Sequence, residues 1–220
     1  MTTRRAKGML ITLSGIDGTG KSAMVGCIRD TLLSKWGAPS RYVWCKFGDH
    51  PFSRLKIAQR AKRRPAASPP EPHHTRRTPS LPLRVYGSLL LILHMAQIVI
   101  SVRRPLKRGE VVVCDRYIFD TIVDLAHDLH CSVARAEKLC GARWIPQPDV
   151  RFLLDLPGEI AFARKDDSYS AARLEERRAL YLSIAPAHQL TMVDARQPFD
   201  QVARQITGAV EAQYAQGIAQ

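Results

Sequence analysis

A glycine-rich octapeptide near the start of the chain has the residue types that bind phosphate. Residues 15–22 read Gly-Ile-Asp-Gly-Thr-Gly-Lys-Ser, which fits the pattern G-x-x-x-x-G-K-[ST]. The glycines let backbone N–H groups turn toward phosphate oxygens, and the helix that follows adds the positive end of its dipole. In such a loop Lys21 reaches the β- and γ-phosphates and the Ser22 hydroxyl serves Mg²⁺. The residues expected to contact ATP here are Gly15, Asp17, Gly18, Thr19, Gly20, Lys21 and Ser22.

A second motif, Asp115-Arg116, follows the apolar run Val-Val-Val-Cys at residues 111–114. An apolar strand that ends in Asp is where a P-loop enzyme keeps a second carboxylate near Mg²⁺. The guanidinium of Arg116 has the geometry to grip a phosphate. Ligands of parallel α/β proteins bind at the carboxyl ends of strands, and both motifs end there. Ser22 and Asp115 are therefore the predicted metal-binding residues; a surface ion pair between Asp115 and Arg116 is the alternative.

Strands and helices must alternate along the chain to position these motifs. Short apolar runs predict strands at residues 9–14, 41–47, 111–115, 150–155 and 190–194. Helical spacing of apolar residues predicts helices at 21–35, 85–102, about 119–140, 158–164, 171–184 and 199–214. Short strands that are apolar on both faces are typical of a parallel sheet covered on both sides. We expect a three-layer α/β fold with a central parallel sheet of about five strands.

Length and composition limit the classes of protein that the chain can form. Its 220 residues predict a single domain, and 45% hydrophobic with 24% charged residues exclude a disordered chain. The five cysteines form no CxxC pair, which indicates free thiols in a reducing, cytoplasmic compartment. Proline-rich residues 54–82 break the alternation and predict a basic insertion or flexible loop.

The positive charge of the chain is concentrated in one stretch. Lys and Arg number 33 against 20 Asp and Glu, and residues 41–108 hold 15 of the basic residues but two acidic ones. This stretch suits a phosphate-bearing partner such as nucleic acid, although a solvated surface is the alternative. Within it, residues 85–102 carry no formal charge. The length of this segment is at the short limit for a membrane-spanning helix. The strand-like runs on both sides are expected to form one sheet, so we expect a buried helix and no membrane span.

Taken together, the motifs resemble those of thymidylate kinase, in the nucleoside monophosphate kinase group. That family carries an acidic residue within the P-loop, matched by Asp17, and an Asp-Arg-Tyr or Asp-Arg-His motif, matched by residues 115–117. The likeness extends over about residues 8–36 and 105–210. It implies a P-loop kinase fold and transfer of the γ-phosphate of ATP to a nucleoside monophosphate, dTMP or a related one. A homodimer is also left open.

The resemblance weakens around the acceptor. Where the family has an Arg-x-Pro-Gly stretch, residues 46–51 read Lys-Phe-Gly-Asp-His-Pro, and residues 91–97 lack the arginine that reads thymine. After Asp-Arg-Tyr the family has small polar residues and Tyr-Gln, whereas this chain has Asp120 and Asp124. The alternative is therefore a P-loop kinase for another acceptor: a modified nucleobase, a nucleic-acid end or a small metabolite. A nucleotide-binding module without turnover is disfavoured, because the phosphoryl-transfer residues are all present.

The resemblance also suggests roles for individual residues. The family places one catalytic arginine in the P-loop or on a lid, and Gly18 occupies the P-loop position. The lid at residues 164–173 must then supply Arg164, with Lys165 and Arg173 in reserve. The expected catalytic residues are Asp17, Lys21, Asp115, Arg116 and Arg164. The expected acceptor-binding residues are Phe47, Arg84, His94, Gln97, Arg116 and Tyr117, with the rings of Phe47 and Tyr117 available for stacking on a base.

Overall fold

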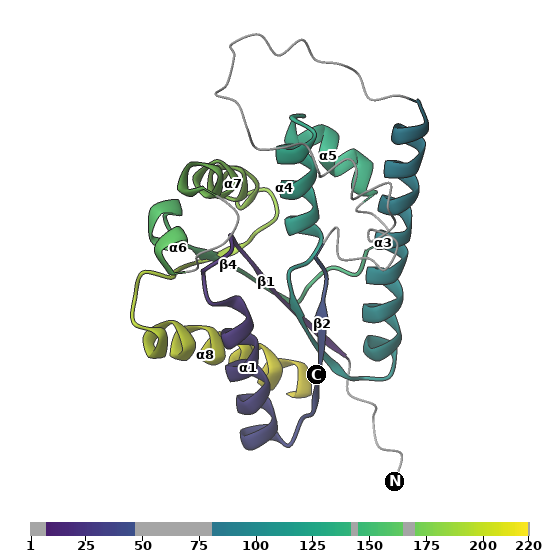
Figure 1. Cartoon of the computed structure of the whole chain (residues 1–220). Coiled ribbons are helices and arrows are strands. Elements are labelled where there is room, and N and C mark those ends of the chain that lie inside the picture. Colours follow the sequence, from purple (N-terminus) through teal and green to yellow (C-terminus); the bar gives the residue numbers. More distant parts are fainter. Residues whose placement is uncertain (1–7, 47–80, 142–144, 165–169, 220) are drawn as a thin grey trace.

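A five-stranded parallel sheet forms the centre of the molecule (Figure 1). The computed structural model describes residues 8–46, 81–141, 145–164 and 170–219, without the side chains of 81–86 and 219. The strand order is β2-β3-β1-β4-β5. The strands are β1 (Met9–Ser14), β2 (Ser40–Trp44), β3 (Val111–Asp115), β4 (Val150–Asp155) and β5 (Thr191–Asp194). The predicted sheet of about five strands is confirmed.

Helices cover both faces of this sheet and give three layers. α1 and α8 pack against each other on one face, and α3 packs against β1, β2 and β3 on the other (Figure 1). The described helices are α1 (Lys21–Trp36), α3 (Leu81–Lys107), α4 (Ile118–Asp128), α5 (Val133–Cys140), α6 (Gly158–Arg164), α7 (Ala171–Ile184) and α8 (Phe199–Ala219). The α/β class and the layering are therefore as predicted.

The two central strands bring the sequence motifs together. Every residue of β1 and β3 is buried, as expected for strands covered on both faces. The parallel register pairs Leu13 with Asp115, so the loop that follows β1 begins beside the end of β3. On its other side β1 pairs with β4. Strands β2 and β3 thus lie on one side of β1 and strands β4 and β5 on the other, so the order of the strands reverses at β1. In open α/β sheets such a switch point is where ligands bind.

Two expected segments differ in detail from the structure. The helical material expected from about residue 119 to residue 140 is present as two helices, α4 and α5. They are separate because His130 has a φ of 47° and Ser132 starts a new helix by accepting a hydrogen bond from the Arg135 N–H at 3.3 Å. The expected insertion ended at Pro82, but α3 already begins at Leu81. A proline in the first helical turn lacks only an N–H that would have no partner there. Residues 54–80 of the expected insertion lie outside the described residues.

Helix α3 is less buried than the sequence suggested. Its segment Gly87–Lys107 is long and apolar enough to cross a membrane by length and composition, and 28% of its most apolar window is buried. The helix nevertheless packs on the sheet, and β2 before it and β3 after it pair in parallel from Ser40 and Val111 onward. A membrane-spanning α3 would separate these paired strands. Its apolar inner row instead belongs to the core.

Candidate active site

Residues 15–22 form a tight loop between β1 and α1, and three glycines make its shape accessible. Gly15, Gly18 and Gly20 have φ values of 142°, 87° and 86°, a region that L residues avoid. The side chain of Lys21, the first residue of α1, folds back over the loop. Its Nζ donates to the carbonyl of Ile16 at 2.6 Å and to Thr19 Oγ1 at 3.1 Å. The loop thereby fixes the Lys21 amino group through one of its carbonyls and one of its hydroxyls.

The ammonium of Lys21 lies in an unusually dry place. The residue is 6% exposed, and burial, followed by the nearby Arg116 charge, lowers its pKa to about 7. Anionic phosphate oxygens placed beside this ammonium would favour its charged form. The geometry thus suits a lysine that becomes fully charged when a polyphosphate binds.

Ser22 and Asp115 are in contact at the expected metal position. The Ser22 hydroxyl, in the first turn of α1, donates to Asp115 Oδ2 at 2.6 Å. Oxygen donors of this kind are those that Mg²⁺ prefers, and it commonly takes its other ligands from phosphate and water. Among the described residues no three His, Cys, Asp or Glu side chains gather to hold a metal. The pair therefore fits a Mg²⁺ ion that arrives with a nucleotide.

Arg116 is held between two carboxylates. Its guanidinium forms ion pairs with Asp17 of the loop and with Asp120 of α4. The backbone of Arg116 has a φ of 68°, and its N–H donates to the carbonyl of Leu13 at 2.9 Å. Burial and the surrounding carboxylates act on its pKa in opposite directions, and the pKa stays raised. A fixed, permanently charged guanidinium therefore lies at the end of β3.

One cavity of about 360 Å³ collects these groups. It is lined by Asp17, Gly18, Gly20, Lys21, Ser22, Ala23, Trp44, Lys46, Asp115, Arg116 and Arg164. The five side chains expected to be catalytic all border this space. Thr19 does not line it but supports the loop, because its hydroxyl donates to the Ile16 carbonyl at 3.0 Å. The cavity is large enough for a nucleotide's phosphate groups.

Helix α6 packs directly on the phosphate loop at Gly18. A Cβ atom at this position would lie 2.6 Å from the carbonyl oxygen of Ala161. An arginine in the loop at Gly18 is therefore sterically excluded. The same helix ends at Arg164, which borders the cavity and donates from Nη1 to the Ala195 carbonyl at 3.1 Å. Helix α6 therefore leaves no room for an arginine at Gly18 and places Arg164 at the border of the same cavity.

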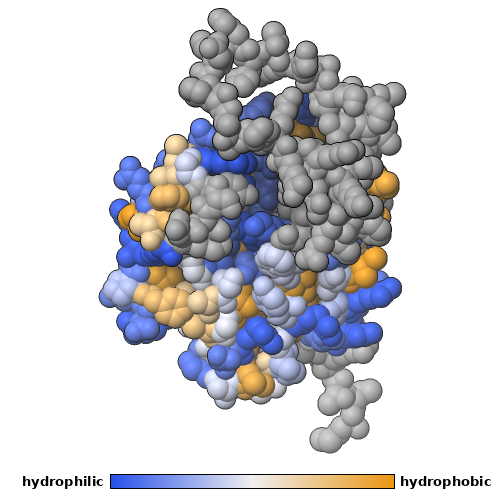
Figure 2. All heavy atoms as spheres, viewed as in Figure 1, coloured by the Kyte–Doolittle hydropathy of each residue, from blue (hydrophilic) through white to orange (hydrophobic). Residues whose placement is uncertain are grey.

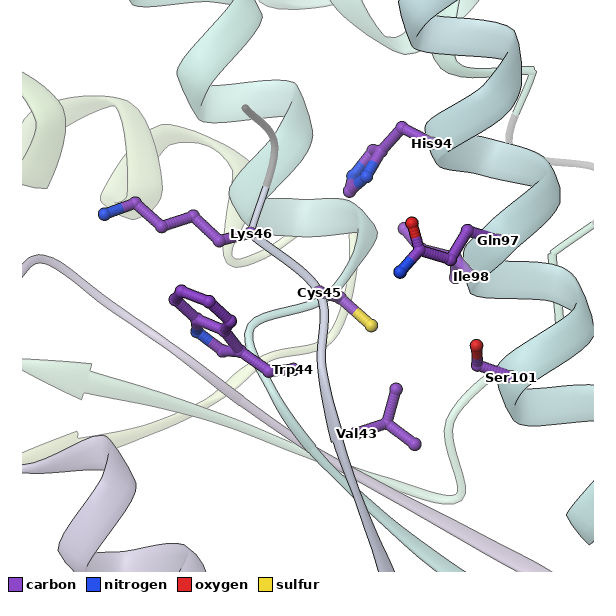
Figure 3. Close-up of a pocket in the computed structure, with 8 residues that line it drawn as sticks. All are labelled: Val43, Trp44, Cys45, Lys46, His94, Gln97, Ile98 and Ser101. Atoms are coloured by element: carbon purple, nitrogen blue, oxygen red, sulfur yellow. The ribbon is translucent and has the colours of Figure 1, made fainter. Parts of the chain in front are cut away.

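A second, smaller cavity lies between the end of β2 and α3 (Figure 3). Its volume is about 70 Å³, and its lining consists of Val43, Trp44, Cys45, Lys46, His94, Gln97, Ile98 and Ser101. Cys45 points toward α3, whereas Trp44 and Lys46 point away from it (Figure 3). These last two residues also line the larger cavity, so the two spaces adjoin.

Comparison with known proteins agrees with this geometry. The family model for thymidylate kinase matches residues 85–206. Thymidylate kinase from Bordetella petrii is 28% identical, with 94% of this chain and 97% of the relative covered. A probable thymidylate kinase from Methanoculleus marisnigri is 31% identical, with 93% and 95% covered. The chain belongs to the thymidylate kinase family. It is a nucleotide kinase.

The acceptor residues predicted for this thymidylate kinase family member lie in different places. His94 and Gln97 border the smaller cavity, and the His94 ring lies 3.1 Å from Thr121 Oγ1. Tyr117 does not: its side chain is fully buried, and its hydroxyl donates to the Pro146 carbonyl at 2.8 Å. The expectation that its ring is open for stacking is therefore wrong for this structure. Phe47, Lys165 and the side chain of Arg84 lie outside the described residues.

Two residues of this thymidylate kinase-like site, Trp44 and Asp120, were not predicted, and a third, Arg173, has a partner that was not predicted. Trp44 borders both cavities. Its position at the carboxyl end of β2, where ligands of parallel sheets bind, is a sequence signal from which this could be predicted. Arg173, considered as a reserve for the lid, instead pairs with Asp128 on α4 at 3.3 Å. Asp120 had been noted only as a departure from the family, whereas it binds Arg116 directly.

Proposed function

We propose that the protein transfers the γ-phosphate of ATP to a nucleoside monophosphate, dTMP or a related one, with Mg²⁺. The observation that carries this proposal is the single cavity bordered by the phosphate loop, the Ser22–Asp115 pair, Arg116 and Arg164. Phosphoryl transfer needs positioned cations around a polyphosphate more than it needs a reactive side chain. Membership of the thymidylate kinase family supports the same reaction.

Each residue would have a role set by its charge and place. The loop amides and Lys21 would bind the β- and γ-phosphates, and Arg116, beside Asp17, would hold the acceptor phosphate. Ser22 and Asp115 would hold Mg²⁺, which supplies positive charge to the phosphate oxygens. Arg164 would stabilise charge on the transferring group, and an arginine in this role can contribute about 10³-fold or more to kcat. We propose residues 164–173 as the lid that carries it.

The metal and phosphate roles can be tested by two conservative substitutions. Asp115→Asn should remove most Mg²⁺-dependent turnover, because an amide lacks the charge that the ion needs. Arg116→Lys should also lower turnover strongly, because an ammonium cannot replace a planar two-pronged donor. Turnover near that of the wild type in either variant, measured as ADP release, would make this pair structural only.

The acceptor is where another kinase reaction competes. The space beside the end of β2 presents His94, Gln97 and Ser101, and residues 91–97 of this helix include no arginine that could read thymine. A P-loop kinase acting on a modified nucleobase, a nucleic-acid end or a small metabolite is therefore the second candidate. ADP release measured with nucleoside monophosphates, oligonucleotides and small alcohols separates the candidates. No release above the basal rate with any nucleoside monophosphate would exclude the first.

A homodimer remains part of the proposal. Large apolar side chains on α3 are exposed at Leu89 (52%), Ile92 (63%) and Ile100 (49%), spaced to lie along one side of the helix. Sedimentation velocity should then give twice the mass of the 24.6 kDa chain. Ile92→Glu should return the protein to a monomer. A wild-type protein that sediments as a monomer at micromolar concentration would contradict the dimer.

A further inference from the structure

A buried carboxylate on α4 lies behind the active-site arginine. Asp120 is 1% exposed and belongs to the first turn of its helix. Its Oδ2 accepts from Ser14 Oγ at 2.7 Å and from the Tyr117 N–H at 2.8 Å. Its Oδ1 accepts from Tyr181 Oη at 2.7 Å and from Arg116 Nη1 at 3.3 Å. Each oxygen thus receives two donors, which is the number that an ionised carboxylate oxygen takes readily.

The donors come from separate parts of the fold. Ser14 is the last residue of β1, directly before the phosphate loop, and Tyr181 belongs to α7. Arg116 and Tyr117 connect β3 to α4. Asp120 therefore joins the strand that begins the loop, the arginine beside the loop and the helix that follows the proposed lid. Helix α7 is further tied to α4 by the buried Arg177–Asp124 ion pair.

Without the Asp120 carboxylate, the guanidinium of Arg116 would lose one of its two ion pairs. The guanidinium lies between Asp17, which belongs to the phosphate loop, and Asp120, which belongs to the first turn of α4. Arg116 also has a left-handed backbone, which a non-glycine residue keeps only when its surroundings hold it. A guanidinium paired to Asp17 alone would move with the loop.

We propose that Asp120 is a positioning residue for the kinase reaction: it fixes the guanidinium of Arg116 against the phosphate loop in the geometry used during phosphoryl transfer. This inference rests on the proposed function for its effect on turnover. Its structural part, the restraint of the Arg116 guanidinium, stands independently.

Steady-state kinetics test the catalytic part of the proposal. Asp120→Asn keeps the size of the side chain, but an amide accepts on one atom only, so two donors lose their partner. We expect kcat to fall at least tenfold while KM for ATP changes less than threefold, because the hydrogen bonds of Asp120 go to Ser14, Arg116, Tyr117 and Tyr181 and its influence on Lys21 is through charge alone. Glu211→Gln, the same carboxylate-to-amide change in an exposed ion pair on α8, should keep kcat within twofold. A kcat of Asp120→Asn within twofold of the wild type would overturn the catalytic role.

Side-chain NMR tests the restraint without any turnover. The Arg116 guanidinium protons, assigned by their loss in Arg116→Lys, should give slowly exchanging signals in the wild type and in Glu211→Gln. These signals should vanish in Asp120→Asn, and their persistence would overturn the proposal. If Asp120→Asn does not fold, Tyr181→Phe removes one of the four hydrogen bonds and should speed this exchange severalfold; unchanged exchange would equally overturn it. A wild type that releases no ADP with any acceptor would refute the proposed function, while the NMR result would still decide the restraint.

Discussion

Lys21 is buried, although lysines are rarely so unless they are paired. Burial lowers its pKa to about 7, so near neutral pH keeping this side chain charged costs free energy of folding when no ligand is bound. Lys21→Met should therefore abolish turnover, by roughly three orders of magnitude or more, without lowering the melting temperature. Calorimetry of the nucleotide-free protein with an ADP-release assay checks both halves. Turnover within threefold of the wild type would remove the lysine from the site.

Asp124 predicts a pH dependence of stability. Burial, with repulsion from Asp120 and Asp128, raises its pKa from 3.8 to about 6, although Arg177 and Arg116 oppose the shift. A carboxyl with a raised pKa stabilises the fold fully below its unfolded pKa, and this contribution is lost as pH rises through about 6. The change in unfolding free energy is about 3 kcal/mol.

The measurement is the difference in unfolding free energy between the wild type and Asp124→Asn, from urea titrations between pH 4 and pH 7. Tyr181, the other titratable group on α7 near this carboxyl, has a pKa raised far above this range. The wild type should lose stability relative to the variant across the interval. A difference that stays constant with pH would show that Asp124 does not titrate there.

Packing between elements predicts that Gly18 is less replaceable than Gly20, although both belong to the same loop. A Cβ at Gly18 would meet the Ala161 carbonyl of α6 at 2.6 Å, whereas one at Gly20 would meet nothing within 4 Å. Both residues have a φ near +87°, so Gly20→Ala carries the backbone strain without the collision. Strain alone costs about 1–3 kcal/mol. Gly18→Ala should unfold at a lower temperature than Gly20→Ala, by thermal melting without nucleotide; equal melting temperatures would mean that α6 does not press on the loop.

Elements defined by local patterns were predictable, and contacts between distant elements were not. The strands at 9–14, 111–115 and 150–155 match the structure because each is a short apolar run next to a turn or motif. The loop and Asp115 were found for the same reason. The pairing of Asp120 with Tyr181 joins residues 61 positions apart, and no sequence pattern marks it. Tyr117 was misjudged because an aromatic residue looks the same in a core and in a pocket.

At the scale of the whole molecule, apolar and charged surfaces are mixed. On the face shown in Figure 2, hydrophobic residues occur in small groups among hydrophilic ones. α3 contributes exposed isoleucines at 92 and 100, yet it also contributes Leu91, Ile98 and Val102 to the core. A helix with one buried row and one exposed row on a sheet is suited to a protein partner more than to lipid on all sides.

The uneven charge of the whole chain gives the last prediction. Eight basic residues and one acidic residue lie between positions 54 and 77, a segment outside the described residues. Such a segment could bind nucleic acid or concentrate a small anionic substrate near the site. We expect the second: deleting residues 54–77 should raise KM for the acceptor, and the intact protein should not bind a short oligonucleotide. Fluorescence anisotropy at two salt concentrations decides this, because nucleic-acid binding would weaken with a log–log slope of about −0.7 per neutralised phosphate on a single strand. Binding at low salt with that slope would contradict the small-anion role and favour a nucleic-acid acceptor.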